Sequence, residues 1–177
     1  MIQIDAGPLL LRELTPDDVS RQYVDWLNDP AINRYLEVRH QPQSVASTRE
    51  FVQAISRRDD DFLFGMFLNQ NEHIGNIRLG PVDQRYRRAL IGLLIGDSNH
   101  HGRGFATHAI AGLCRWAFSE LKLHKLEAGC YSSNQGSKRA FEKVGFQVEG
   151  RLREHWLVEG APEDHLSLGL LASEFAL

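Results

Sequence analysis

The stretch from Arg88 to Phe118 constrains the fold more than any other part of the sequence. It begins with a continuous apolar run, Arg88–Asp97, typical of a strand that is buried on both faces. A turn containing Gly102 and Gly104 follows and leads without a break into an amphipathic helix. This order predicts a central strand that is followed by a glycine turn and a helix. The apolar side chains of the helix that face the core are Ile110, Leu113, Cys114, Ala117 and Leu121.

The remaining patterns predict a mixed α/β protein that forms one domain over residues 1–177. Thr15, Pro16 and Asp18 are typical of a helix start, while Gly145 is a natural helix end. The predicted elements are a strand over 8–14, a helix over about 16–27, a broken helical segment over 28–39, a helix over about 45–57, a hairpin over 62–82 with its turn at 70–72, a strand over about 125–131, a short helix over 134–145, and an antiparallel pair over 146–158 and 165–171.

The start of the long helix is suited to binding an anion. The first backbone N–H groups of a helix lack internal partners, and the helix dipole adds partial positive charge there. Gly102 and Gly104 have no side chain to block a ligand, and Arg103 adds a cation beside them. The turn therefore has the sequence context of a pyrophosphate cradle.

Other interpretations of this turn fit less well. A P-loop needs a lysine after its second glycine, and none is present. A dinucleotide fingerprint would place glycine or alanine at Thr107, although Glu127 stands at the spacing of a ribose ligand. The histidines His100, His101 and His108 do not stand at ligand spacing with acidic or cysteine partners, so we expect no metal.

Composition restricts the partners of the chain. Lys and Arg total 20 against 23 Asp and Glu, which gives a net charge of -3 and a pI near 6.2. This balance does not favour nucleic acid or an anionic membrane surface. Cys114 and Cys130 lack disulfide or metal spacing, and no apolar run approaches the roughly 18 residues of a membrane helix. We therefore expect a cytoplasmic protein with reduced thiols.

Two motifs give the chain a family resemblance. The segment "LIGLLIGDSNHHGRGFATHAI" fits the acyl-CoA motif R/Q-x-x-G-x-G/A over residues 101–106, with histidine at its first position, and "NQGSKRAFEKVGF" fits a second motif. Together, and in this order, they resemble the GCN5-related N-acetyltransferases (GNAT), in particular the ribosomal-protein-alanine acetyltransferase-like branch. The resemblance runs over nearly the whole chain. It implies a mostly antiparallel twisted sheet that is flanked by helices and contains a splayed strand pair.

The resemblance also implies where acetyl-CoA binds. The cofactor would lie in an opening between the strand that ends at Ile95 and the strand that begins near Lys125. Its pantetheine would contact the first strand, its pyrophosphate would contact the turn, and Asn134 would contact its arm. The implied cofactor-binding residues are Gly92, Leu93, Leu94, Ile95, His101, Gly102, Arg103, Gly104, Phe105, Ala106, Asn134, Ser137, Phe141 and Lys143.

Acetyl transfer needs an oxyanion donor, a proton donor for the leaving thiol and a base for the amine. The backbone amide of Leu94 is the expected oxyanion donor. Many relatives carry a tyrosine where this chain has Phe141, so Ser137 is the expected proton donor. Glu154 is the predicted base, on the assumption that Glu154 and His155 alternate along a regular strand.

The acceptor is a primary amine of either of two kinds. The first helical segments and the final hairpin recognise substrates in this family, and they supply Trp26, Asn33, Tyr35, Glu37, Arg39 and Asp164. A nucleotide-linked amino sugar would use aromatic stacking and Arg39, whereas a protein N-terminus would use Glu37 and Asp164. The sequence does not choose between these acceptors, nor between a monomer and a homodimer.

Two other functions compete with acetyl transfer. Phe141 and His101 depart from the family pattern, which leaves open a catalytically weak acyl-CoA-binding regulatory module. The partial dinucleotide fingerprint leaves open an oxidoreductase.

Overall fold

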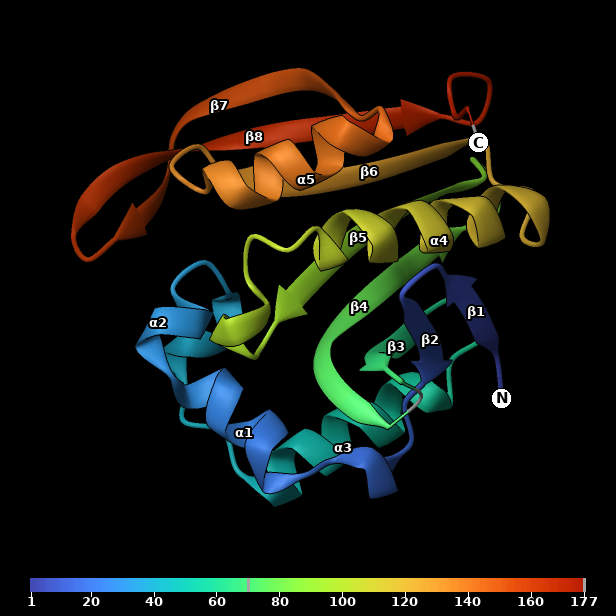
Figure 1. Cartoon of the computed structure of the whole chain (residues 1–177). Coiled ribbons are helices and arrows are strands. Elements are labelled where there is room, and N and C mark those ends of the chain that lie inside the picture. Colours follow the sequence, from blue (N-terminus) through green and yellow to red (C-terminus); the bar gives the residue numbers. More distant parts are fainter. Residues whose placement is uncertain (70, 177) are drawn as a thin grey trace.

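The computed structural model describes residues 1–69 and 71–176, and their strands form one eight-stranded sheet (Figure 1). The strand order is β1-β2-β3-β4-β5-β6-β8-β7, and only β5 and β6 pair in parallel. The strands are β1 (Gln3–Ala6), β2 (Leu9–Glu13), β3 (Phe62–Leu68), β4 (Glu72–Asp83), β5 (Arg88–Ile95), β6 (Lys125–Tyr131), β7 (Gln147–Val158) and β8 (Ala161–Leu171).

Helices cover both faces of this sheet (Figure 1). The α-helices are α1 (Arg21–Asn28), α2 (Pro30–Asn33), α3 (Val45–Ser56), α4 (Phe105–Ser119) and α5 (Gln135–Val144), and the 3-10 helices are η1 (Pro16–Asp18), η2 (Glu37–His40) and η3 (Ser98–His100). Within β3, Phe64 and Met66 belong to the large core beneath α4, whereas Leu63 and Phe67 belong to a second core with α1 and α3. Alternate residues of a strand point to opposite faces, so the two cores lie on opposite sides of the sheet.

The splayed strand pair predicted from the resemblance is present. The parallel ladder between β5 and β6 has four residue pairs and ends at Ile91 and Ala128. Beyond that point β5 stays paired with β4 as far as Ile95, and β6 stays paired with β8 as far as Tyr131. Beyond the ladder, each of the two strands stays paired with its outer neighbour, so β5 and β6 diverge. The edges that they turn toward each other have no strand partner there among the described residues. The mixed α/β fold with a mostly antiparallel sheet is confirmed.

Several local predictions hold. Helix α4 buries Ile110, Leu113, Cys114 and Ala117 completely, and Leu121 packs against the core just past the helix end. Helix α5 ends at Gly145, which has the left-handed φ of 110° expected of a helix stop. The β3–β4 hairpin is antiparallel, although residue 70 of its predicted turn lies outside the described residues.

Other local predictions are wrong. A continuous helix over 16–27 does not form, because Val19 is extended and the chain restarts at α1 with Ser20 accepting a hydrogen bond from the N–H of Tyr23. The Thr15 cap therefore serves only the single turn η1. Strand β5 is not buried on both faces, because Leu90 is 48% exposed while Ala89 and Ile91 are buried.

One end of the sheet was not predicted, and the other, the antiparallel pair β7–β8, was. Strand β1 has no counterpart in the predicted elements, and it forms one edge by pairing with β2. Strands β7 and β8 continue beyond β6 as a two-stranded arm (Figure 1). None of the helices in the described ranges is both long and apolar enough to cross a membrane.

Candidate functional site

The glycine turn follows η3, shortly after the end of β5, and opens helix α4. Gly102 and Gly104 have positive φ angles of 71° and 84°, and a Cβ built on either meets nothing within 4 Å. Gly104 is the N-cap of α4, and no side chain caps the helix. The first amides of α4 are therefore available to an anion in a space free of side chains, which fits the predicted pyrophosphate cradle.

Two side chains hold this turn in place. The Nε2 atom of His101 lies 2.9 Å from the carbonyl oxygen of Ile95. Because a carbonyl can only accept, Nε2 carries the proton and ties the turn to the end of β5. The guanidinium of Arg103 lies 5.2 Å from the ring centre of Phe105 and stays exposed. A cation is thus fixed beside the first turn of α4.

His100 links the same turn to the β3–β4 hairpin. Its ring is 8% exposed, with Nδ1 3.1 Å from Asp97 and Nε2 3.5 Å from Glu72. A backbone hydrogen bond from Asn99 is the main cause that lowers the pKa of Asp97. The expectation that these histidines lack acidic neighbours is therefore wrong for His100. The carboxylates of Asp97 and Glu72 face opposite nitrogens of the His100 ring. We therefore interpret these three residues as polar contacts that hold the turn against the β3–β4 hairpin.

The end of β5 offers its free edge to the splay. Leu94 pairs with Asn76 of β4, and the ladder to β6 has already ended at Ile91. The Gly92–Ile95 backbone is therefore placed where a pantetheine arm could pair with it as a strand would. The Leu94 amide, the predicted oxyanion donor, faces β4: Ile74 and Gly96 form a hydrogen-bonded pair, so Asn76 and Leu94, two residues further along, form the next one.

The start of α5 closes the other side of the splay. Asn134 is the N-cap of α5, and its side-chain oxygen accepts a hydrogen bond from the N–H of Ser137 at 3.1 Å. Its amide nitrogen is left to contact a ligand. The Ser137 hydroxyl has no hydrogen bond to another described residue, so it is free for the predicted proton transfer. Phe141 is 1% exposed and packs on Phe146, whereas Lys143 is exposed in the last turn of α5.

Glu163, which was not among the predicted site residues, supports this region. Its Oε1 accepts hydrogen bonds from the hydroxyl of Ser132 at 2.6 Å and from the N–H of Ser133 at 2.7 Å. The Ser132 bond is the main cause that lowers the pKa of Glu163. Because Glu163 lies far along the chain from the segment it holds, local sequence patterns give no signal of this contact.

A cavity of about 340 Å³ lies beside the splayed end of β5. Its walls come from α1, η2, α3, β3, β4 and β5, and Gly92, Leu93 and Leu94 contribute the β5 side. Most of the lining is apolar. Among the described residues that line it, Glu37 is the one carboxylate and Arg78 the one cation. The cavity is open to the strand end where an acetyl group is expected.

Glu37 also makes a bond across the splay to β6. The Tyr131 hydroxyl donates to Glu37 at 2.5 Å and accepts from the Arg39 guanidinium at 2.9 Å. Burial, and then the bond to Glu37, raises the pKa of Tyr131. Tyr35 packs against Tyr131 with ring centres 5.4 Å apart. Three predicted acceptor residues thus gather around Tyr131. Tyr131 itself was not predicted, because its only sequence signal is its place at the end of β6.

Trp26 and Asn33 lie elsewhere. The Trp26 ring is 7% exposed in the second core, and a Cβ at Gly96 would meet it at 2.0 Å. Asn33 is 7% exposed and donates from its side-chain nitrogen to the carbonyl of Leu27 at 2.8 Å. Neither residue lines the cavity. Their burial gives them supporting roles, because a ring in the core offers no open face for stacking.

Strand β7, which contains Glu154, was predicted to be regular, but it is irregular around this residue. The β7–β8 register shifts between Leu152 and Trp156, and Glu154 has a positive φ of 52°. The assumed alternation of Glu154 and His155 is therefore wrong, because a bulge re-aims both side chains. The Glu154 side chain is exposed, and it is not part of the cavity lining.

Asp164 is occupied by its neighbours on the same arm. It accepts a hydrogen bond from the N–H of Glu154 at 2.7 Å and forms an ion pair with Arg151. These contacts, in that order, lower the pKa of Asp164. A carboxylate stabilised in this way is a weak base, so Asp164 is better suited to holding the arm than to taking a proton.

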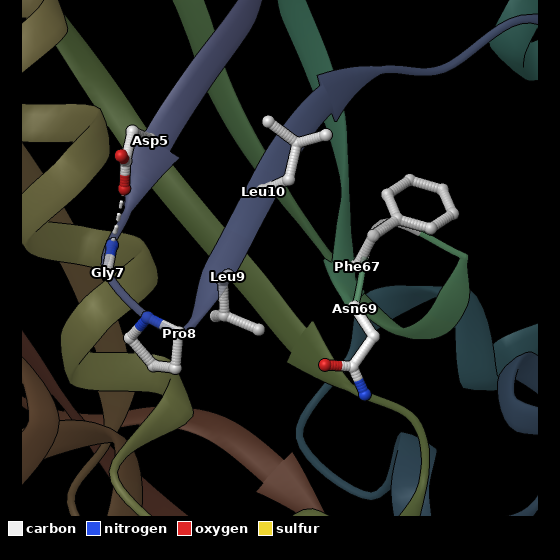
Figure 2. Close-up of a pocket in the computed structure, with 7 residues that line it drawn as sticks. All are labelled: Asp5, Gly7, Pro8, Leu9, Leu10, Phe67 and Asn69. Carbon is white, nitrogen blue, oxygen red and sulfur yellow. Dashed lines mark hydrogen bonds between the residues drawn. The ribbon is translucent and has the colours of Figure 1, made fainter.

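A second hollow, of about 300 Å³, lies at the turn between β1 and β2 (Figure 2). The Asp5 carboxylate accepts a hydrogen bond from the N–H of Gly7 there, and Leu10, Phe67 and Asn69 line the rest of the hollow. No residue predicted for the site lines it. We therefore assign the site to the splay and the cavity beside β5.

The comparisons with known proteins agree with this geometry. A family profile described as "Acetyltransferase (GNAT) domain" matches residues 8–147. The chain belongs to the GNAT acetyltransferase family. The probable N-acetyltransferase YjcK of Bacillus subtilis is 34% identical over 139 residues, which cover 77% of this chain and 74% of the relative. The sequence prediction of an N-acetyltransferase that uses acetyl-CoA is confirmed.

Two further relatives cover nearly all of this GNAT chain. The prophage-derived N-acetyltransferase YokL of Bacillus subtilis is 31% identical over 169 residues, which cover 96% of this chain and 93% of the relative. The crystal structure of spermidine N-acetyltransferase from Vibrio cholerae in complex with CoA and spermine has a TM-score of 0.85 at 26% identity and covers 94% of this chain and 97% of that chain.

Proposed function

We propose that this enzyme acetylates a primary amine by direct attack in a ternary complex, with the amine entering through the cavity beside β5. The observation that carries the proposal is the shared wall: Gly92, Leu93 and Leu94 line the cavity and also form the unpaired end of β5 at the splay. An acceptor in the cavity and a donor in the splay would meet at this strand, so no covalent enzyme intermediate is needed.

Acetyl-CoA would supply the activated acetyl group as a thioester. The chain's own groups then have separate tasks. The amides that open α4 bind the diphosphate, and the edge of β5 aligns the arm. The backbone of Leu94 is bonded to Asn76 of β4, so we assign the hydrogen bond to the developing oxyanion to an amide on the splay-facing edge of β5, that of Leu93 or Ile95. Ser137 gives its proton to the leaving sulfur, since its hydroxyl is otherwise uncommitted.

We assign the base to Glu37 in place of Glu154. Glu37 lines the cavity, whereas Glu154 is exposed on the β7–β8 arm. The bond from Tyr131 fixes Oε1 of Glu37. The other oxygen lies 3.7 Å from Nε2 of His40 without a hydrogen bond to a described residue, so it can receive the ammonium group of an acceptor. Proton removal by such a positioned carboxylate contributes roughly 10²-fold or more to rate.

The charges of the cavity favour a monoamine over a polyamine. Relatives include spermidine acetyltransferases, whose acceptor carries several positive charges. Here Glu37 forms an ion pair with Arg39 at 3.5 Å, and Arg78 in the same lining is paired with Asp61. A polycation therefore finds no surplus of negative charge among the described residues of the cavity. An amino sugar or a protein N-terminal amine, the two predicted acceptors, fits this balance better. The ribosomal-protein acetyltransferase-like branch stays a prediction.

Release of free CoA thiol from acetyl-CoA tests the proposal. We expect turnover with at least one monoamine from a panel of amino sugars and short peptides, and little with spermidine. Glu37→Gln should lower kcat/KM by about 10²-fold. Glu154→Gln is the matched control, and it should retain activity within a factor of a few.

Two outcomes would contradict the proposal. Acetyl-CoA binding without thiol release on any amine would point to a regulatory acyl-CoA-binding module. Thermal stabilisation by NAD(P) but not by acetyl-CoA would favour an oxidoreductase, because only a cognate ligand raises the melting temperature appreciably.

A further inference from the structure

The cavity beside β5 contains two buried polar atoms that have no partner among the described residues. They are the hydroxyl oxygen of Thr48 on α3 and the side-chain nitrogen of Asn76 on β4. Thr48 is 1% exposed and Asn76 is 5% exposed. Buried polar groups are almost always hydrogen-bonded, because leaving them unpaired costs stability. Two such groups in the wall of one cavity point to a ligand that completes them.

His73 fixes which way the Asn76 amide points. Its Nε2 lies 3.0 Å from the carbonyl oxygen of Gly75 and 2.9 Å from Oδ1 of Asn76. Both neighbours are acceptors, so Nε2 must carry the proton. The Asn76 oxygen is therefore held by His73, and the nitrogen on the other side of the same amide has no partner among the described residues.

The His73 ring is itself fixed. It stacks on Phe67 with ring centres 4.9 Å apart and meets Trp26 edge-on at 5.2 Å. Burial lowers the pKa of His73, so the ring is neutral at pH 7 and its single proton is the one on Nε2. The packing of His73 against Phe67 and Trp26 thus determines the orientation of the Asn76 amide. This orientation is fixed before a substrate binds.

The position of the donor relates it to the reaction. Asn76 pairs with Leu94 across the β4–β5 ladder, so it stands at the level of the strand end where the amine is acetylated. Thr48 comes from a helix and Asn76 from the sheet, so two separate walls contribute. A group that accepts from the Asn76 N–H and exchanges a hydrogen bond with the Thr48 hydroxyl is an oxygen. The lining is mostly apolar and its Arg78 is already paired with Asp61, so an uncharged carbonyl or hydroxyl oxygen fits it better than a charged one.

We propose that Thr48 and Asn76 are specificity-determining residues that bind an oxygen of the acceptor, so that the enzyme selects primary amines with a carbonyl or hydroxyl oxygen near the amino group. The apolar lining, which includes Leu27, Leu36 and Leu63, receives the rest of the molecule. This inference rests on the proposed function and adds a requirement to it. Simple alkylamines lack the oxygen and would leave both groups unpaired.

A matched series of amines tests the requirement. Leucinamide carries a carbonyl, leucinol carries a hydroxyl, and isoamylamine has the same branched body without oxygen. We expect the wild-type kcat/KM for leucinamide or leucinol to exceed that for isoamylamine by about tenfold, the effect of one or two hydrogen bonds in a closed site. Whichever oxygen compound is preferred identifies the oxygen as carbonyl or hydroxyl.

Variants connect the preference to the two residues. Thr48→Val should raise KM for the preferred oxygen compound about threefold to tenfold with little change in kcat, and leave isoamylamine within about twofold. Thr48→Ser keeps the hydroxyl and should keep the preference. Asn76→Asp replaces the amide donor with an acceptor, so it should abolish the preference for the oxygen compound, as Thr48→Val does. Ser56→Ala, on the exposed side of the same helix, is the control and should behave as wild type.

Melting temperatures separate binding from structure. Because the Thr48 hydroxyl has no partner in the free protein, Thr48→Val should melt at or above the wild-type temperature. A clear drop would assign the hydroxyl to the fold and overturn the proposal, as would equal kcat/KM for all three amines. If no amine at all is acetylated, the proposed function fails instead.

Discussion

At the scale of single residues, the pH response of the fold is carried by buried imidazoles such as His73. Burial lowers the pKa of His73 below its ordinary value of 6.5. Above pH 6.5 the ring is neutral in both folded and unfolded chains, so pH has no effect through it. As pH falls below 6.5 the unfolded chain binds a proton more readily, and stability is lost until the folded-state pKa is reached.

We therefore predict that the free energy of unfolding decreases between pH 7.5 and pH 5.5, and that His73→Gln reduces this decrease. The His73 share is at most about 1.4 kcal/mol at pH 5.5, one pH unit below the unfolded pKa. Glutamine keeps an amide donor for Asn76 but does not titrate. Urea unfolding at both pH values checks the prediction, and an unchanged pH slope in the variant would contradict it. Burial also lowers the pKa of His165, so some slope should remain.

Sequence alone could identify some site residues and not others, for a physical reason. Gly102 and Gly104 were predictable because their role depends on local backbone conformation. Tyr131 and Asn76 were not, because their roles depend on Glu37 and His73, which pairing and packing bring to them. Glu37 was predicted for the acceptor region and lines the cavity beside β5, yet its partner across the splay was not foreseeable.

At the scale of elements, the β5–turn–α4 unit depends on glycine for two separable reasons. Gly104 has a left-handed φ of 84°, which strains any residue with a side chain, and it stands where a ligand must approach the backbone. Gly160, in the turn between β7 and β8, has nearly the same φ of 82° and an equally open Cβ position. It is therefore a matched control for backbone strain.

We predict that Gly104→Ala and Gly160→Ala each lower stability by about 1–2 kcal/mol, the cost of a left-handed conformation for an L-residue. Only Gly104→Ala should also weaken acetyl-CoA binding, by about tenfold or more, since one lost charge-assisted hydrogen bond has that effect. Denaturant unfolding and calorimetric titration measure the two quantities. Equal acetyl-CoA affinity in both variants would show that the diphosphate does not bind at this turn.

Element boundaries show where local rules succeed and where they fail. The end of α5 at Gly145 follows from one residue type, and the prediction holds. The bulge around Glu154 does not follow from any residue type in β7, because the register shift depends on how β8 pairs with it. The break at Val19 is intermediate: Thr15 and Pro16 do start a helical turn, but it ends at Asp18 and the chain restarts at α1 with Ser20 as its cap.

At the scale of the whole molecule, the β5–β6 ladder is a narrow connection between two parts of the sheet. Strands β1–β5 lie on one side and β6–β8 on the other, with four residue pairs between them. An ion pair between Arg88 and Glu127, at 3.0 Å, reinforces the closed end of this ladder. A ligand in the splay would contact both parts, so binding should stabilise the sheet as a whole.

We predict that acetyl-CoA slows amide hydrogen exchange most at residues 92–95, 101–106 and 129–131, which line the splay and its turn. Acetyl-CoA at a hundred times its Kd should add about 2.7 kcal/mol to the free energy of unfolding by linkage. The β2–β3 ladder, distant from the splay in the strand order, should gain protection only in proportion to this global effect. Exchange measured by mass spectrometry with and without acetyl-CoA decides the matter. Protection centred on the hollow lined by Asp5 and Asn69 (Figure 2) would instead move the coenzyme to the β1–β2 turn.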